Sequence, residues 1–251
     1  MSEKPRALVT GGGKRIGAAI VRRLAELNFA VTIHVLNSRS EAEDLIKTLP
    51  DSNQHSVTVA DLSIPEVRQQ WLATLPGFDL VVNNASVYRL TAPGTEETPQ
   101  SRQRYWQTNY LAPLEITAHV LNKLTPARQN ALVVHLLDCD ILTADGGLKA
   151  PEEPPTGVDS YLYSRIMLGR ITKIMAAEKA PALRINAIAP GPVLPPVNCS
   201  TPGMTRILDS VPLHRPAGVE EIAAAVEFFW KNPSLTGVIL PVDGGKHLNN
   251  Q

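Results

Sequence analysis

Tyr161 and Arg165 have the residue types and spacing most suggestive of chemistry in this chain. Residues four positions apart share one face of a helix, so the phenol and the guanidinium would be neighbours. A nearby positive charge stabilises tyrosinate and makes the phenol a better proton donor or acceptor. Arginine keeps its charge throughout the accessible pH range, so it supplies an electric field but relays protons poorly. The pair predicts a proton-transfer site whose cation acts by electrostatics.

A glycine-rich turn, Gly11-Gly12-Gly13-Lys14-Arg15-Ile16-Gly17, connects a short apolar run at 6–10 to a helical pattern at 16–27. Glycines at such a turn let the backbone approach a pyrophosphate, whose charge suits a helix N-terminus. A tight turn without a ligand is the alternative. Its position after the first strand of an alternating pattern favours the phosphate site.

The segment after the second expected strand selects the nucleotide. Its residues are Asn37, Ser38, Arg39 and Ser40. An acid here would accept from a ribose 2′-hydroxyl, whereas Arg39 and its serine neighbours suit a 2′-phosphate. Lys14 or Arg15 offers a second cation, so we predict NADPH as the cofactor. The alternative for Arg39 is a solvated charge at a helix start.

The elements that must position these residues alternate between strands and helices. Strands are expected at 6–10, 30–36, 56–59, 80–83, 131–137, 184–189 and 238–242, and helices at 16–27, 41–49, from 65, and at 104–124, 160–178 and 219–230. Near-continuous apolar strands that alternate with helices indicate an α/β fold with a parallel sheet covered on both faces. We expect one domain over residues 1–251.

Ser63 is expected to cap the helix that begins near Pro65. Asp61 and Leu62, after the third strand, are placed to meet the adenine, although Asp61 also suits a simple helix-start acid.

Composition excludes several classes of function. The 251 residues carry 24 basic and 24 acidic side chains, which disfavours a nucleic-acid or anionic-membrane partner. The two cysteines, Cys139 and Cys199, lie in no ligand-spaced cluster, so we expect neither a disulfide scaffold nor a metal site. No long apolar run is present. These features predict a cytoplasmic protein.

Six motifs occur in a fixed order: the glycine turn, Asn83-Asn84-Ala85-Ser86, Thr108-Asn109-Tyr110-Leu111-Ala112-Pro113, Tyr161 with Arg165, Ile185-Asn186-Ala187-Ile188-Ala189-Pro190-Gly191-Pro192, and Asp243-Gly244-Gly245. Together they resemble the short-chain dehydrogenase/reductase family along essentially the whole chain. The resemblance implies a Rossmann-type doubly wound sheet of seven strands in the order 3-2-1-4-5-6-7. It also implies a homotetramer with long helices at one interface.

Within that family the chain is most similar to the pteridine reductases. The glycine turn carries Lys14-Arg15 where most relatives have small residues, and His34 matches the subgroup's style. Tyr88 stands where pteridine reductases have an aromatic that stacks on the pterin; a core or rim tyrosine is the alternative. Asp138 ends the fifth strand, where the wider family ends with its catalytic serine.

The resemblance implies four catalytic roles. Tyr161 donates a proton as hydride arrives from the nicotinamide. Arg165 replaces the family's usual lysine, supplies the field and binds the nicotinamide ribose. Asn109 holds a relay water, and Asp138 helps protonate a ring nitrogen. Because arginine relays protons poorly, the relay is either broken or routed through Asp138. The alternative for Asp138 is an acid at a strand end in an inactive protein.

The resemblance also implies sets of binding residues. Cofactor contacts are assigned to Gly11, Lys14, Arg15, Ile16, Gly17, Asn37, Ser38, Arg39, Ser40, Asp61, Leu62, Asn84, Ala85, Ser86, Pro190, Gly191 and Val193. Substrate contacts are assigned to Arg15, Ser86, Tyr88, Asp138, Tyr161, Pro192 and Leu194. A polar segment at 142–157, longer than relatives usually have, is expected to be a lid or binding element over the substrate side.

These observations predict an NADPH-dependent reductase of a pterin or a similar flat heterocycle. Two alternatives stay open. One is a short-chain reductase of another carbonyl compound. The other is a nucleotide-binding sensor or scaffold with weak catalysis, which the Arg165 substitution and the long segment would favour.

Overall fold

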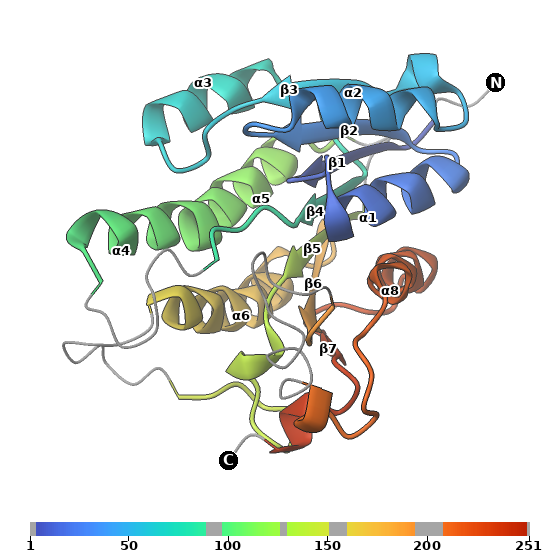
Figure 1. Ribbon diagram of the computed structural model, residues 1–251. Helices are drawn as coiled ribbons and strands as arrows, with labels where there is room; N and C mark the ends of the chain where they lie inside the picture. The colour runs from blue at the N-terminus through green and yellow to red at the C-terminus, as the bar shows by residue number, and fades with distance from the viewer. Residues whose placement is uncertain (1–3, 89–96, 126–129, 151–159, 194–207, 250–251) are drawn as a thin grey trace.

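The computed structural model describes residues 4–88, 97–125, 130–150, 160–193 and 208–249. Its centre is one parallel seven-stranded sheet in the order β3-β2-β1-β4-β5-β6-β7, which confirms the expected topology (Figure 1). The strands are β1 (Arg6–Thr10), β2 (Ala30–Val35), β3 (Ser56–Val59), β4 (Leu80–Asn83), β5 (Ala131–Leu136), β6 (Leu183–Pro190) and β7 (Ile239–Val242). All residues of β4 and β5 are buried, as expected for strands covered on both faces.

Helices cover both faces of the sheet (Figure 1). Side chains of α1 (Arg15–Glu26), α2 (Arg39–Lys47) and α8 (Val219–Lys231) form one core layer. The opposite layer is built from α3 (Pro65–Thr74), α5 (Ala112–Asn122) and α6 (Ser160–Lys179), with α4 (Pro99–Trp106) beside α6. Short turns are η1 (Ser52–Gln54), η4 (Cys139–Ile141) and η5 (Lys246–Asn249). None of the helices in the described ranges has the length and apolar character needed to cross a bilayer.

The helix expected at 104–124 is interrupted. Between α4 and α5 the chain forms a π-turn, η2 (Gln107–Leu111), centred on Asn109. Pro113 follows in the first turn of α5, and its ring prevents a normal helical hydrogen bond to the carbonyl four residues earlier. That carbonyl belongs to Asn109. Pro113 therefore cannot donate to the carbonyl of this motif residue, and π-turns of this kind often occur near functional sites.

His34 ties three strands together beneath the glycine turn. Its Nδ1 accepts from the amide of Gly11 at 3.4 Å, and its Nε2 lies 3.1 Å from the carbonyl of Ala60. The ring is 2 % exposed. Burial lowers the pKa of His34 from its ordinary 6.5 to about 4, although the Ala60 carbonyl and Asp61 oppose this. A neutral His34 thus connects the glycine turn after β1 to the residue that follows β3.

The depressed pKa of His34 predicts acid lability. Between pH 6.5 and about 4, His34 is protonated in the unfolded chain but neutral in the folded chain, so the free energy of unfolding decreases as the pH falls. The stability lost between these two pH values amounts to about 3 kcal/mol. We expect His34→Gln to be less stable than wild type at pH 7, with the gap narrowing at pH 4.5. Urea unfolding at both pH values measures this, and a constant gap would contradict it.

Candidate active site

The carboxyl ends of all seven strands lie at one edge of the parallel sheet. The strand order reverses at the β1–β4 junction, because β2 and β3 lie on one side of it and β5, β6 and β7 lie on the other. In open α/β sheets such a switch point forms a crevice that binds ligands. The glycine turn follows β1, the 84–88 segment follows β4, and Asp138 follows β5. The predicted residues are thereby brought to one edge from distant parts of the sequence.

The glycine turn is packed too closely for larger residues. A Cβ on Gly17 would lie 2.2 Å from the carbonyl oxygen of Gly11, whose φ of +64° also favours glycine. Asn84 holds this turn, because its Nδ2 donates to the carbonyls of Thr10 and Gly11 at 2.9 and 3.0 Å. The N-cap residue of α1, Lys14, makes no side-chain cap. The side chain of the N-cap residue therefore does not compete with an anion for the first amides of α1.

Thr10, which the sequence analysis did not select, organises the neighbouring loop. Its Oγ1 accepts from the amides of Asn84 and Ala85, each at 3.0 Å. The side chain is buried at the end of β1. Beyond this anchor, Ser86 and Tyr88 are exposed in the loop after β4. A polar residue directly before the glycines was the available signal for Thr10.

The predicted phosphate-binding cations lie at the surface beside the glycine turn. Lys14 pairs with Glu41 at 2.6 Å, and Arg39 pairs with Glu43 at 2.8 Å. Arg15 is exposed, and its φ is +53°. Asn37 and Ser40 are also exposed, Ser38 is half-buried, and Ile16, in the first turn of α1, is partly buried against the core. The cations therefore belong to a charged rim shared with the acids of α2.

Asp61 is engaged in a local turn. Its Oδ1 accepts from the amide and hydroxyl of Ser63 at 2.8 and 2.6 Å. The expectation that Ser63 caps α3 is therefore wrong, because the N-cap is Ile64 and the Ser63 hydroxyl is directed to Asp61. Leu62 is buried, and its carbonyl accepts from Arg68 at 2.5 Å. Both residues shape the loop after β3.

Tyr161 and Asp138 are in direct contact. The Tyr161 hydroxyl donates to Oδ2 of Asp138 at 2.8 Å, while Oδ1 of Asp138 accepts from the amide of Asp140 at 2.9 Å. Burial raises the pKa of Asp138, and the negative charge of Asp140 raises it further. Burial also raises the pKa of Tyr161 well above 10, with the charge of Asp138 adding to it. The pair is thus built to hold a proton.

Arg165 lies on the same helix face as Tyr161, with its guanidinium carbon 5.6 Å from the centroid of the ring. Only 2 % of Arg165 is exposed, and Nη1 donates to the carbonyl of Leu136 at 3.1 Å. Its charge lowers the pKa of Tyr161, as the sequence suggested, but burial and Asp138 outweigh that effect. Nε of Arg165 has no hydrogen-bond partner among the described residues. One buried donor therefore still lacks an acceptor.

His135 is a buried neighbour whose importance the sequence did not indicate. Its Nδ1 lies 3.1 Å from Nδ2 of Asn83. Burial and the charge of Arg165 lower the pKa of His135 to about 3. The ring therefore remains neutral beneath the site at any ordinary pH and adds no second cation.

Asn109 connects α6, η2 and the loop after β4. Its Oδ1 accepts from the amide of Val87 at 2.9 Å, and its Nδ2 donates to the carbonyl of Val87 at 3.0 Å. Nδ2 also lies 3.4 Å from Oγ of Ser164 on α6. The side chain of Asn109 thus positions the loop that carries Ser86 and Tyr88.

Aromatic rings surround the Tyr161 phenol. Tyr88 meets it edge to face, with ring centroids 5.0 Å apart, and Tyr105 does so at 6.2 Å. Tyr88 is 54 % exposed, whereas Tyr105 is buried. Tyr163 stacks instead on Trp106. Tyr88 therefore presents an open aromatic surface beside Tyr161.

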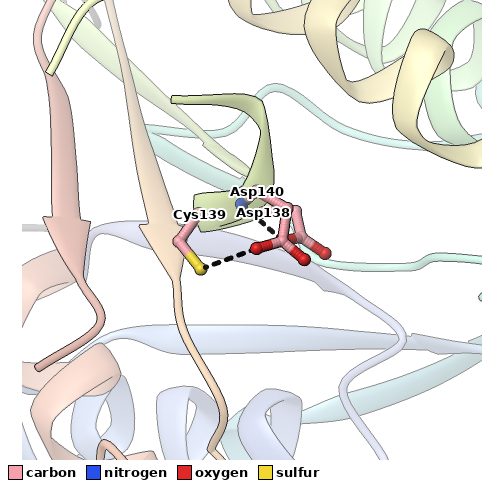
Figure 2. Close-up of side chains that lie close together, drawn as sticks. All are labelled: Asp138, Cys139 and Asp140. Atoms are coloured by element: carbon pink, nitrogen blue, oxygen red, sulfur yellow. Dashed lines mark hydrogen bonds between the residues drawn. The ribbon is translucent and has the colours of Figure 1, made fainter. Parts of the chain in front are cut away.

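Cys139 and Asp140 complete a cluster with Asp138 that the sequence analysis did not identify. One ligand-type atom from each residue lies within 4.8 Å of the others, and Figure 2 shows the two carboxylate groups side by side. The Cys139 thiol is directed to Oδ1 of Asp140 at 3.7 Å. Lys246 forms an ion pair with the same oxygen. An ammonium group already neutralises part of the charge of the cluster.

The segment expected to form a lid is partly structured. Leu142 and Leu148 form an antiparallel bridge, and a Cβ on Gly169 of α6 would meet Leu148 at 2.9 Å. Residues 142–150 therefore pack as a hairpin on the body of the protein, while 151–159 fall outside the described residues.

After β6, a Cβ on Gly191 would lie 2.6 Å from Cα of Asp243, so the chain passes close to the end of β7. Pro190 and Pro192 are half-buried, Val193 is buried, and Leu194 falls outside the described residues.

Comparisons with known proteins agree with this architecture. A family profile described as enoyl-(acyl carrier protein) reductase matches residues 12–247. L-xylulose reductase of Mus musculus is 31% identical over 247 residues, which cover 96% of this chain and 95% of that protein. The crystal structure of FolM alternative dihydrofolate reductase 1 from Brucella suis in complex with NADP is 32% identical, with a TM-score of 0.83 and coverage of 98% and 96%. The corresponding Brucella canis protein, also complexed with NADP, is 32% identical, with a TM-score of 0.81 and coverage of 97% and 94%. The ordered motifs, the sheet topology and these matches show that the chain belongs to the short-chain dehydrogenase/reductase family.

Proposed function

We propose that this short-chain oxidoreductase uses NADPH to reduce a pterin-like substrate in the cytoplasm, with Tyr161 and Asp138 as the proton-donating pair. The observation that carries the proposal is the 2.8 Å hydrogen bond from the Tyr161 hydroxyl to Asp138, at the position where the wider family has serine. Pterin reduction requires a proton at a ring nitrogen, and a carboxyl group of raised pKa can supply one.

The residues present fit a dinucleotide cofactor. The close contacts at Gly11 and Gly17 leave no room for a side chain at either position, so the turn stays tight, and the N-cap residue Lys14 makes no side-chain cap that would compete with an anion for the first amides of α1. Pyrophosphate binding needs this combination. The buried Nε–H of Arg165 is a donor suited to a ribose hydroxyl. Once bound, NADPH would supply the hydride.

Within this proposal, each side chain has a defined task. Tyr161 and Asp138 hold a transferable proton, and Arg165 limits how strongly burial disfavours negative charge on the phenol. Asn109 positions the loop after β4 through its two hydrogen bonds to Val87. Tyr88 offers a face to a flat heterocycle, a contact that contributes about 1 kcal/mol beyond burial.

A second candidate activity is reduction of another carbonyl compound, favoured by the 31% identity to an L-xylulose reductase. NADPH absorbance followed with dihydrobiopterin, dihydrofolate, L-xylulose and a ketone panel separates the candidates. Turnover of the pterins with negligible turnover of the ketoses supports our proposal, and the reverse pattern refutes it. Tight NADPH binding without oxidation by any compound would favour the sensor or scaffold.

Cofactor choice gives a separate prediction. If the Arg39 guanidinium contacts the 2′-phosphate, Arg39→Ala should weaken NADPH binding by about tenfold, equivalent to about 1.4 kcal/mol. Affinity for NADH should remain unchanged because it lacks that phosphate. Fluorescence titration of both cofactors measures the difference, with the exposed Lys47→Ala on the same helix as control. Equal losses for the two cofactors would contradict a phosphate contact.

The proposal includes a homotetramer with α4, α5 and α6 at one interface. Family resemblance supports this assembly, and Ile174 of α6 exposes half of its apolar side chain. Light scattering coupled to size exclusion tests it. A mass near that of one chain, 27.2 kDa, would exclude the tetramer.

A further inference from the structure

Lys246 links the C-terminal turn to the carboxylates next to Tyr161. It follows β7 in η5, and its ammonium pairs with Asp140, whose own neighbour Asp138 accepts the Tyr161 hydroxyl. In the side chains of the ion pair, 21% of Lys246 and 35% of Asp140 are exposed. Tyr161 is 5% exposed. The ion pair therefore lies at the solvent end of a chain of polar groups that ends at the phenol.

The turn that carries Lys246 is well defined. Oδ1 of Asp243 accepts from the amide of Gly245 at 2.9 Å, and its Oδ2 accepts from the amide of His247 at 2.7 Å. Gly244 and Gly245 have φ values of +66° and +86°, which turn the chain back toward η4. These contacts fix the backbone position from which the Lys246 side chain extends to Asp140.

We propose that Lys246 and Asp140 form a positioning pair that sets the protonation of Asp138 and so controls the proton available to Tyr161. This inference rests on the proposed function, because it assigns a regulator to the same proton-donating pair. Lys246 and Asp140 act on Asp138 through space, in opposite directions: the carboxylate favours a protonated Asp138, and the ammonium favours an ionised one.

The surroundings of Asp138 support this balance. Among the described residues, the titratable and charged groups around it are Cys139 and Asp140 on η4, Tyr161 and Arg165 on α6, and Lys246 on η5, with Asp243 and His247 nearby at the end of β7 and in η5. Burial raises the pKa of Asp138 most, Asp140 raises it further, and Lys246 lowers it. Burial lowers the pKa of Lys246 itself, but its hydrogen bond to Asp140 and the adjacent acidic groups raise it overall. The ammonium therefore stays charged while Asp138 titrates.

Opposite shifts in two variants give the test. With ¹³C-carboxyl-labelled aspartate in the full-length protein, the Asp138 resonance is assigned by its loss in Asp138→Asn and then titrated with pH. Lys246→Met should raise the midpoint by about one pH unit, and Asp140→Asn should lower it by a similar amount. Lys246→Arg, which retains the charge, should restore the wild-type midpoint. Lys246→Gln provides a second neutral variant if the methionine disturbs folding, and circular dichroism checks each protein.

Enzyme activity provides the second readout. If protonated Asp138 is the active form, the alkaline limb of the pH–activity profile should shift to higher pH in Lys246→Met and to lower pH in Asp140→Asn. Midpoints that are unchanged, or that move in the same direction, would overturn the proposal. The NMR titration needs no substrate, so it separates the two ideas. Shifted midpoints without pterin turnover would refute the substrate assignment alone, whereas pterin turnover with unshifted midpoints would refute the positioning role alone.

Discussion

Asp138→Ala is expected to lower the rate of NADPH-dependent reduction by about 10²- to 10⁴-fold, the range for loss of a general acid. The carboxyl accepts a hydrogen bond from the Tyr161 hydroxyl at 2.8 Å, and burial and the charge of Asp140 raise its pKa, which favours its protonated form. Its removal deletes a proton source and the partner of the phenol together. Affinity for NADPH should stay within about twofold, because the glycine turn and the Arg39 rim are untouched. Stopped-flow hydride transfer and fluorescence titration measure the two quantities.

Asp138→Asn separates position from proton supply. The amide oxygen can still accept the Tyr161 hydroxyl, but the side chain cannot donate an acidic proton. Our interpretation therefore expects the asparagine variant to be nearly as slow as the alanine variant. Combining Asp138→Asn with Tyr161→Phe should cost little more than either change alone, because groups that act as a unit are not additive.

Two controls define what would contradict a catalytic role. Asp44→Ala removes an exposed acid of α2 that pairs with Lys47, far along the sequence from the site, and should retain wild-type turnover. If Asp138→Ala lost NADPH affinity and turnover together, Asp138 would be an acid that supports the structure. Its contact with the Asp140 amide makes that outcome physically possible.

The fold was predictable from the sequence because its signals are local and repeated. Apolar strands alternate with helical patterns, and right-handed parallel crossovers leave few arrangements. Apart from Asn109 in η2, the motif residues follow strand ends or lie on α6, so a parallel sheet brings them to one edge. The contact of Tyr161 with Asp138 follows from this geometry, although no local pattern gives its 2.8 Å distance.

The missed features depend on contacts between distant segments. Lys246 is separated from Asp140 by 106 positions, and no spacing rule connects them. The π-turn at Asn109 was indicated by Pro113 four residues later, a signal that the regular helical pattern concealed. The net pKa of Tyr161 was also beyond reach, because burial and Asp138 oppose Arg165 and only the folded geometry decides which effect is larger.

Arg165→Met is expected to reduce turnover by about a hundredfold or more. The guanidinium carbon lies 5.6 Å from the Tyr161 ring centroid and is the group that lowers the pKa of the phenol. Without this charge, burial and Asp138 act unopposed, and negative charge on the phenol becomes still less accessible. NADPH binding should weaken as well if the Nε–H serves a ribose hydroxyl. Lys173→Met, an exposed change further along α6, should leave both quantities unchanged.

Arg165→Lys asks whether the unusual cation limits proton supply. Lysine keeps the positive charge but can also pass a proton to water, whereas arginine cannot. If resupply is slow in the wild type, the lysine variant should turn over faster, and the pH dependence of its turnover should change. An unchanged rate and profile would refute a resupply role for position 165. Adding Lys246→Met to Arg165→Lys then identifies the route of proton resupply. If protons arrive through Asp138, the loss of Lys246 should still change the turnover of the Arg165→Lys variant. If the new lysine passes protons directly, the loss of Lys246 should have a smaller effect on turnover than in the wild type.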